Sequence, residues 1–207
     1  MATRSPAPPK ARRTQADRSA TTRDALVAAG RELFAAQGFA AVPADAIVTA
    51  AGVSRGALYH QFADKTALFE AVLEAVEADV AGRLAESVAA AGITEPVEAL
   101  RYAVRTWLDI CVEPEIHQIA LLDGPSVLGW ARWREVCLSH VFGLVQSLLA
   151  SGIEAGQIRS LPARPLAHAL MAAGDEAALY VVDATDRKQA RSEMTEVLDQ
   201  LIAGVTA

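Results

Sequence analysis

The amino-acid sequence predicts an all-α protein, with an N-terminal helix-turn-helix head and a C-terminal helical bundle. Three observations support this fold class: the chain is rich in alanine, 52% of its residues are hydrophobic, and runs of β-branched residues are few. The 207 residues are enough to bury a full hydrophobic core.

The first helix is expected from about Arg18 to Gln37, where apolar residues recur at helical spacing on one side. Gly38 provides its stop, since glycine is common just after the last residue of a helix. The residues expected to face inward are Leu26, Ala29, Leu33 and Phe34.

Two short helices around a tight turn are expected next. Pro43 suits the first position of a helix that ends near Ala50. Gly52 then turns the chain, because a residue that follows a helix with positive φ is normally glycine. Val53 supplies an apolar contact after the turn, and Ser54 is a good N-cap for the next helix.

The helix that begins at Ser54 has two different sides. At about 100° per residue, one side gathers Ala57, Leu58, Gln61 and Phe62. The other side gathers Arg55, Gly56, Tyr59 and His60. A short helix held by apolar residues on one side leaves its other side free to enter a DNA major groove about 12 Å wide.

The polar side has the chemistry of a DNA-reading surface. Arg55 lies at the helix start, where its fork can bond guanine O6 and N7 together. Gly56 has no side chain to keep the backbone away from DNA. Tyr59 and His60 suit phosphate contacts through a hydroxyl and an imidazole N–H.

A further helix is expected to begin after Asp64, which can act as its N-cap. Lys65 and Thr66 lie in its first turn, where free backbone N–H groups and the helix dipole favour a phosphate. We therefore expect Ser54 and these two residues to join Arg55, Gly56, Tyr59 and His60 as DNA-binding residues.

Residues 18–72 resemble the DNA-binding domain of the TetR family of bacterial transcriptional regulators. The resemblance rests on the run AGVSRGALYHQF from Ala51 to Phe62, together with Lys65 and the pair Leu68-Phe69, and it covers about a quarter of the chain. It implies a DNA-binding head over residues 18–65 and an effector-binding and dimerisation domain over residues 66–207. It also implies a repressor that leaves its operator when a small molecule binds.

The chain departs from the family pattern at two places. Val42-Pro43 stands where the family usually has Ser or Thr, so an N-cap hydrogen bond is expected to be lost at a cost of about 1 kcal/mol. Val48 occupies a position that is often alanine in the family. Neither change removes an expected DNA contact.

Charge is divided unequally along the chain. Residues 1–70 carry nine Lys or Arg against six Asp or Glu, and residues 71–207 carry ten against nineteen, so the net charges are +3 and −9. DNA repels an acidic body, and the molecule is expected to approach it head first. Alternatively, most of the acidic residues simply lie on solvent-exposed helix surfaces.

Residues 1–17 contain three prolines and four basic residues without apolar periodicity, and are expected to be a disordered basic arm. Such an arm can enter the minor groove beside a recognition helix. A tail that only aids solubility is an equal alternative.

The body is expected to be a series of helices. The helix after Asp64 is expected to reach about Ala90 and to link head and body. The next helices are expected from a Thr94 cap to about Val112, near Ile116 to Leu122 between breaks at Pro114 and Pro125, and then to about Glu154, followed by a connector from Gly156 to Pro165.

The last two helices are expected from about Pro165 to Val182 and from Arg187 to Val205. The first has alanines at a spacing of four (Ala169, Ala173 and Ala177), and the second has an apolar stripe (Met194, Val197, Leu198, Leu201, Ile202 and Val205). Similarity to the TetR family implies that this pair forms a homodimer interface. Part of both stripes can also face the protein's own core. A dimer places two recognition helices about 34 Å apart, which predicts an inverted-repeat operator.

A small-molecule pocket is expected in the body, because aromatic walls with a few polar groups are typical of ligand sites. The candidate ligand-binding residues are Trp107, Cys111, His117, Trp130, Trp133, His140 and Phe142. Taken one by one, these residues are more often core or surface residues, so the pocket rests mainly on the family resemblance. The effector's identity is open, and no cofactor is expected.

Three alternatives remain. The head could serve an architectural DNA-binding protein controlled by a protein partner, or a transcriptional activator. A helical metal enzyme could use Cys137 with His140, or His168 with Asp175 and Glu176, but the Glu-x-x-His pairs of di-iron bundles are absent. We expect neither a metal nor catalysis.

Two features bear on location. The N-terminus lacks the apolar segment of a signal peptide, and two cysteines are too few for a disulfide framework, so a cytoplasmic protein is expected. Residues 136–153 carry no formal charge. A polar stripe there (His140, Gly143, Ser147 and Ser151) favours a helix inside a bundle, and no membrane partner is expected.

Overall fold

The computed structural model describes residues 15–207, and the regular structure over that range is helical, as the sequence predicts. The head comprises α1 (Gln15–Gln37), α2 (Ala44–Ala51), α3 (Arg55–Gln61) and the start of α4 (Lys65–Ala90). The body adds α5 (Pro96–Ile110), α6 (Pro114–Ile116), the π-helix η1 (His117–Asp123), α7 (Gly124–Leu128), α8 (Trp130–His140), α9 (Phe142–Glu154), α10 (Ala163–Asp183) and α11 (Arg187–Ala203).

The predicted C-terminal boundary of the disordered arm is wrong. Residues 15–17 belong to α1 instead of preceding it, and Thr21 and Thr22 bond backward to the carbonyls of Asp17 and Arg18 within the same helix. Residues 1–14 of the predicted arm lie outside the described residues.

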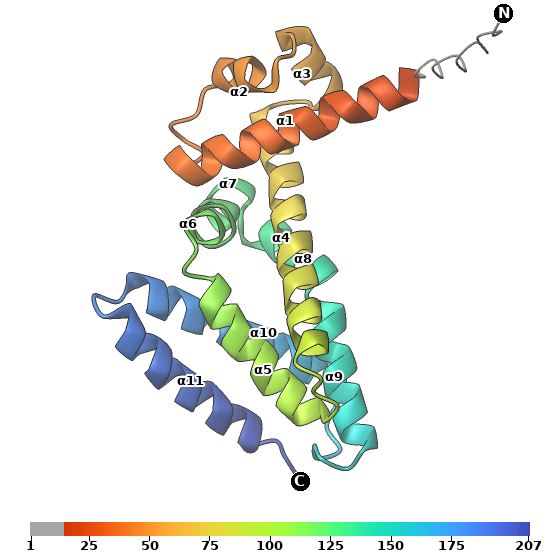
Figure 1. Cartoon of the computed structure of the whole chain (residues 1–207), viewed down its shortest axis with the longest axis vertical. Coiled ribbons are helices and arrows are strands. Elements are labelled where there is room, and N and C mark those ends of the chain that lie inside the picture. Colours follow the sequence, from red (N-terminus) through yellow and green to blue (C-terminus); the bar gives the residue numbers. More distant parts are fainter. Residues whose placement is uncertain (1–14) are drawn as a thin grey trace, which may run out of the picture.

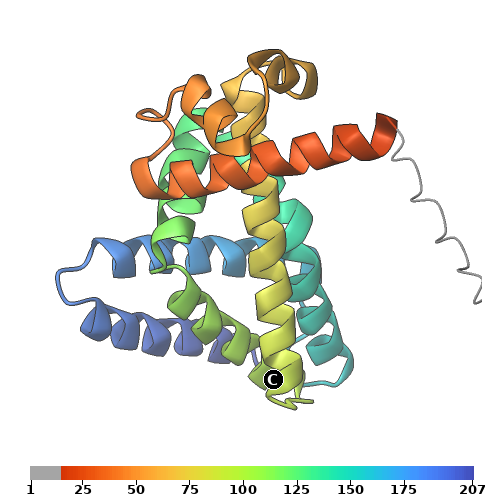
Figure 2. The same ribbon diagram turned by 45° about the horizontal axis from the view of Figure 1, so that its top comes forward.

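One long helix joins the two parts of the molecule. Figure 1 shows α1 lying across the upper end of α4, with α2 and α3 beyond it and the body below. Figure 2 shows the same crossing from another angle, with α10 and α11 running beside each other at the edge of the body. A displacement of α4 in the body is therefore carried directly to the head.

Head and body share one hydrophobic core. Phe69 of α4 lies 5.4 Å from the ring of Phe34 and 5.3 Å from that of Phe39, with edge-to-face geometry in both pairs. The same cluster of buried side chains continues down α4 and reaches Ile119 of η1 and Trp133 of α8. The head is thus packed onto the body and does not hang from a flexible linker.

Two predicted boundaries in the body are wrong. Thr94 does not cap α5: Glu95 is the N-cap, its side chain makes no capping hydrogen bond, and Pro96 opens the helix. Residues 114–128 also run through as three joined helical segments, because each proline lies at the first or second position of its segment, where its missing N–H costs no helical bond.

The long helix predicted to end near Glu154 is divided. The chain first breaks at Gly129, which has φ of 75°. It breaks again at Val141, where α8 and α9 meet at a bend of 57°. Among the described residues, no single helix is long and apolar enough to cross a membrane, and only the bent pair α8 and α9 meets that test of length and composition.

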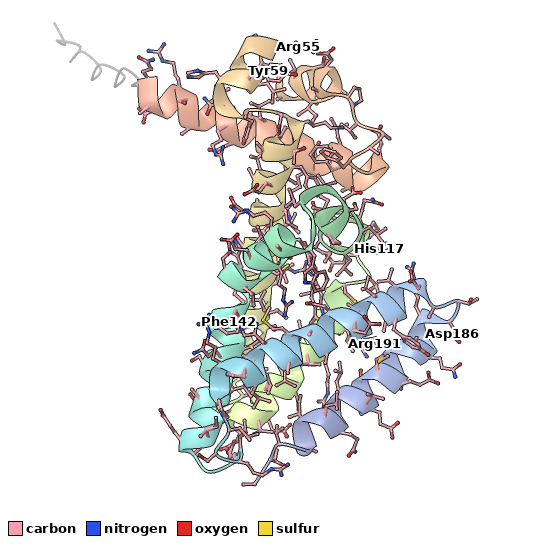
Figure 3. The ribbon with its side chains drawn as sticks, turned by 180° about the vertical axis from the view of Figure 1, so that it is seen from behind. Arg55, Tyr59, His117, Phe142, Asp186 and Arg191 are labelled. Atoms are coloured by element: carbon pink, nitrogen blue, oxygen red, sulfur yellow. The ribbon has the colours of Figure 1, made fainter. Side chains whose placement is uncertain are left out.

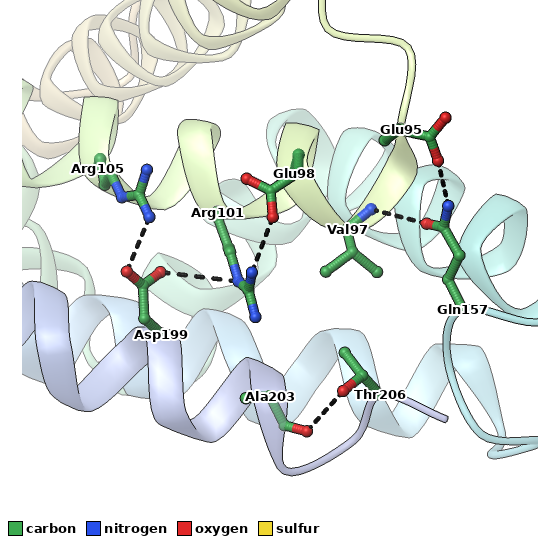
Figure 4. A network of polar contacts seen from close by, with 9 residues as sticks. All are labelled: Glu95, Val97, Glu98, Arg101, Arg105, Gln157, Asp199, Ala203 and Thr206. Carbon is green, nitrogen blue, oxygen red and sulfur yellow. Dashed lines mark hydrogen bonds and ion pairs between the residues drawn. The ribbon is translucent and has the colours of Figure 1, made fainter.

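Helix α11 is held against α5 by a polar network (Figure 4). Arg105 of α5 donates to Asp199 at 2.8 Å, and the Nε atom of Arg101 lies 4.0 Å from the same carboxylate. Leu198 and Ile202, on either side of Asp199 in sequence, are buried in the body. These contacts fix which side of α11 faces outward.

Candidate nucleic-acid interface and ligand cavity

The turn between α2 and α3 has the predicted geometry. Gly52 adopts φ of 65°, and its N–H donates to the carbonyl of Thr49 at 3.2 Å. The Oγ atom of Ser54 accepts from the N–H of Ala57 at 3.1 Å, which confirms Ser54 as the N-cap of α3. The Val53 N–H bonds back to the Val48 carbonyl at 3.2 Å and sets the angle between the helices.

The predicted division of α3 into two sides is confirmed. Leu58 is fully buried and Phe62 is 4% exposed, whereas the predicted DNA-facing residues are all exposed. Figure 3 shows Arg55 and Tyr59 at the end of the head farthest from the body. The Arg55 guanidinium lies 3.1 Å from Asp45 of α2 and 5.8 Å from the centre of the Tyr59 ring. Both partners are on the surface, so the guanidinium can exchange them for a base.

The start of α2 shows the expected departure. Pro43 is the N-cap and makes no side-chain capping hydrogen bond, as predicted from its replacement of Ser or Thr. The sequence predicted Pro43 as the first helical residue, whereas α2 begins one residue later, at Ala44. The helix is nevertheless held by fully buried Ile47 and by half-buried Val48, which packs on the core cluster.

Asp64 caps α4 as predicted, accepting from the Ala67 N–H at 2.8 Å. Lys65 is placed differently from the expectation of an open phosphate contact. Its ammonium donates to the carbonyls of Phe39 and Val42 at 2.8 and 2.9 Å and lies 4.0 Å from the centre of the Phe39 ring. The geometry gives Lys65 a structural role in holding the loop before α2, while Thr66 is half-buried beside it.

Replacing Lys65 by alanine distinguishes a structural role from a phosphate contact. We expect a loss of about 1–3 kcal/mol in the free energy of unfolding, because two carbonyls lose their donor. The slope of log affinity for DNA against log salt should stay unchanged. A slope that falls by about one unit with unaltered stability would instead establish the phosphate contact. Urea unfolding and anisotropy titrations measure the two quantities, with Lys65→Arg as the variant that keeps the charge.

The body contains a cavity of about 80 Å³ lined by α4, α5, η1, α8, α9 and α10. Two of the predicted ligand-binding residues, Trp107 and Trp133, line it. Their indole N–H groups already donate to the carbonyls of Gly174 at 3.0 Å and Ala120 at 2.8 Å. They therefore offer ring surface, not hydrogen bonds, to a ligand.

The other five predicted pocket residues do not line the cavity. Cys111 is buried against α10 and α11, and Trp130 is 68% exposed on the outer side of the Trp133 ring. Phe142 packs on His168 in a separate cluster, and it lies apart from His117 in Figure 3. His140 is half-buried near the bend. Neighbours in sequence point to different sides of their helices, which is why these five positions lie away from the cavity.

Three polar residues in the cavity wall were not predicted as ligand-binding. They are Glu77 of α4, Cys137 of α8 and Asp175 of α10. Glu77 could have been found, because it interrupts the apolar stripe that α4 buries at Leu73, Val76, Val80 and Leu84. A carboxyl within such a stripe indicates a functional or paired group.

The electrostatics of this site centre on Glu77, the one buried charged side chain among the described residues, at 6% exposure. Burial raises its pKa from the usual 4.5 to about 7, and the nearby Asp175 adds to the rise. The Cys137 thiol donates to its Oε1 atom at 3.4 Å. Burial also raises the pKa of Asp175. Arg134 donates to this carboxylate at 2.6 Å, and its hydrogen bond and positive charge oppose that rise.

Glu77→Gln should remove a pH dependence of stability. Between pH 4.5 and about 7 the folded protein holds the Glu77 proton more tightly than the unfolded chain does. The bound proton therefore contributes fully to the free energy of unfolding below pH 4.5, and this contribution is lost as the pH rises through about 7. The free energy of unfolding of the variant should therefore rise relative to that of the wild type from pH 5 to pH 8, by up to about 3 kcal/mol. Thermal unfolding across that range measures the gain. Glu74→Gln, at a half-buried position of α4 outside the cavity, is the control. A Glu77→Gln stability curve that runs parallel to that of the wild type would contradict the assignment.

Ion pairs tie the cavity helices to the head. Arg31 of α1 bonds Glu115 of α6 through two nitrogens, at 2.6 and 2.8 Å, and also pairs with Asp79 of α4. Asp123, at the end of η1, accepts from the Phe39 N–H at 2.7 Å. Since η1 and α4 both line the cavity, two elements of its wall also contact the head.

Three of the residues suggested for a metal site contact other groups. Cys137 contacts Glu77, Asp175 contacts Arg134, and the His168 ring lies tilted against that of Phe142. Over residues 15–207, no group of three or more His, Cys, Asp or Glu side chains is arranged to hold a metal ion.

Comparisons with known proteins match both parts of the chain. The family model described as bacterial regulatory proteins, tetR family, matches residues 26–72. The model described as tetracyclin repressor-like, C-terminal domain, matches residues 97–205, about half of the chain.

Two solved structures are similar over most of the chain, and one curated repressor is similar over about half of it. A TetR-family transcriptional regulator from Pectobacterium atrosepticum is 29% identical, with a TM-score of 0.79 over 94% of this chain and 98% of that one. RolR, solved in complex with resorcinol, is 18% identical, with a TM-score of 0.71 over 91% and 96% of the two chains. The HTH-type transcriptional repressor AcnR of Corynebacterium efficiens is 31% identical over 102 residues, which are 47% of this chain and 50% of that protein.

Proposed function

Because this chain belongs to the tetR family of bacterial regulatory proteins, it is a DNA-binding, ligand-responsive transcriptional regulator, and we propose that it is a repressor acting as a homodimer on an inverted-repeat operator. The observation that carries the proposal is the exposed row Arg55, Gly56, Tyr59 and His60 on a helix whose other side is buried. The similarity to AcnR, a transcriptional repressor, favours repression over activation.

We propose residues 18–65 as the DNA-binding domain and residues 66–207 as the effector and dimerisation domain. Arg55 would read a base edge, and Tyr59 and His60 would contact phosphates. The backbone N–H groups at the start of α4, at Lys65 and Thr66, would face the DNA backbone, while the Lys65 side chain holds the loop before α2. Such work requires no catalysis, and two buried free cysteines support a reducing, cytoplasmic setting.

The proposed dimer uses the outward sides of α10 and α11. Tyr180, Val197 and Leu201 are about half exposed, at 49%, 50% and 49%, although they are large and apolar. The predicted alanine strip is divided in the structure, since Ala177 is buried in the body and Ala169 is exposed. Apolar surface on two adjacent helices is what a four-helix dimer interface would cover.

Leu201→Glu tests this interface. An uncompensated charge at a buried interface costs about 3 kcal/mol or more per site, so the dissociation constant of the dimer should rise at least about 100-fold. Light scattering after size exclusion measures the assembly. Ala85→Glu, which adds the same charge on the exposed side of α4, should leave it unchanged, and a dimer that survives Leu201→Glu would refute this interface.

Effector binding is proposed to act through the cavity. A ligand that binds the DNA-incompetent arrangement more tightly shifts the heads by displacing α4, and a coupling of about 1–3 kcal/mol weakens operator binding about 5- to 150-fold. RolR, which shares the fold, was solved with the small aromatic resorcinol, in keeping with an effector of modest size.

Selection of bound sequences from a random DNA library with the purified protein tests the function. An enriched inverted repeat is the expected result. Enrichment of a single half-site would reject the dimer, and enrichment of no sequence would favour an architectural DNA-binding protein that needs a protein partner.

A further inference from the structure

The cavity has one polar corner within an apolar wall. Glu77, Cys137 and Asp175 come from three different helices and meet there. Asp175 is neutralised by Arg134 at 2.6 Å, whereas the hydrogen bond of Glu77 within the described chain is the weak thiol contact from Cys137. Glu77 therefore keeps acceptor capacity that its surroundings do not use.

The charges of this corner select against anions. Two carboxyls face the cavity, and the single guanidinium beside them, Arg134, is already engaged by Asp175. A ligand carboxylate or phosphate would meet two acids in a site of low dielectric constant. A ligand cation would instead find the free oxygen of Glu77, with Asp175 close enough to affect its charge.

The remaining wall suits hydrocarbon. Trp107 and Trp133 present ring surface, since their N–H groups are bonded elsewhere, and ring faces also attract cations. Apart from the polar corner, the other lining residues are aliphatic side chains, with Gly174. The site thus combines one hydrogen-bond acceptor with an apolar chamber.

We propose that the effector is a compact apolar amine, whose ammonium group is bonded by Glu77 while its hydrocarbon part contacts Trp107 and Trp133. The assignment rests on the proposed role of this cavity as the effector site. It names the ligand's chemical class, which similarity to the family does not supply.

The size of the cavity connects this ligand to regulation. A cavity of about 150 Å³ accepts benzene, so the present volume of about 80 Å³ must grow for a single ring to enter. Glu77 lies on α4, eight residues after Phe69 of the shared core, which is about 12 Å along the helix. The ligand's ammonium group would bond to Glu77 while its ring widens the cavity. Both effects act on α4, the helix that carries the head.

Four probes of similar size test the proposal: benzylamine, benzyl alcohol, toluene and benzoate. Calorimetry with the full chain should show benzylamine binding at least about tenfold more tightly than benzyl alcohol, and no binding of benzoate. Glu77→Gln should reduce benzylamine to the level of benzyl alcohol and leave toluene unchanged. Glu74→Gln, on the same helix but outside the cavity, should behave as the wild type.

The proposal is overturned if toluene or benzoate binds as well as benzylamine, if Glu77→Gln leaves benzylamine binding intact, or if no probe binds. Circular dichroism checks the fold of the variant, and Asp175→Asn provides a second variant that should also weaken benzylamine binding. Operator binding is measured separately by anisotropy. Benzylamine binding without operator binding would reject the regulator and keep the ligand class, and the opposite result would reject only the ligand class.

Discussion

Replacing Phe69 by alanine should lower the free energy of unfolding by about 3–5 kcal/mol, the range for truncating a buried phenylalanine. The side chain is fully buried and makes edge-to-face contacts with Phe34 and Phe39, which belong to α1 and the loop after it. Its loss leaves a cavity where head and body share their core. Urea unfolding followed by far-ultraviolet circular dichroism measures the change.

Two variants frame this result. Phe69→Leu keeps most of the volume and should cost clearly less than the alanine variant. Tyr59→Ala removes an aromatic ring from the exposed side of the same head and should change stability by less than about 0.5 kcal/mol. If Phe69→Ala costs no more than Tyr59→Ala, the continuous core between head and body is wrong.

Replacing Arg55 by alanine should weaken operator binding by about 1–3 kcal/mol, which is about 5- to 150-fold. The guanidinium is exposed at the first position of α3 and is held only by surface contacts to Asp45 and Tyr59. A bidentate bond to one base pair would be lost, so preference should relax at that base pair and stay intact elsewhere. Anisotropy titrations against the operator and its single-base variants measure both effects.

The matched control is Arg159→Ala, which removes the same charge from an exposed position of the body. It should leave the preference at every base pair unchanged. Equal losses for the two variants would mean that Arg55 contributes only net charge, and unaltered affinity and preference in Arg55→Ala would remove it from the interface.

The head could be predicted closely because its signals are local. Gly52 adopts a positive φ, and Ser54 and Asp64 each accept from an N–H three residues later. The local sequence is therefore enough to predict the conformation at each of these residues. Lys65 was the exception. Its ammonium is bound by carbonyls 23 and 26 residues away, and no feature of the adjacent sequence indicates that contact.

The body was harder to predict because its breaks depend on tertiary packing. Pro114 and Pro125 were expected to end helices, yet each opens the next helical segment, and η1 between them is a π-helix. The 57° bend at Val141 lies in an apolar run without proline. Helix propensity alone gives no reason to divide the chain there.

The cavity was only partly predictable. The cluster of aromatic residues in the sequence includes Trp107 and Trp133, which line the cavity, but also Trp130, which is the first residue of α8 and is 68% exposed. The informative residue was Glu77, a carboxyl inside the buried stripe of α4. Its partners Cys137 and Asp175 lie 60 and 98 positions further along the chain and meet it only after folding.

The most direct test of the regulator is an anisotropy titration of the selected operator at several salt concentrations, with the number of bound protomers counted. We expect two protomers on one inverted repeat and an affinity that falls steeply with salt, with a slope of about −0.9 per phosphate neutralised. A single protomer on the operator, or an affinity that does not depend on salt, would contradict a dimer that approaches DNA through its exposed α3 surfaces.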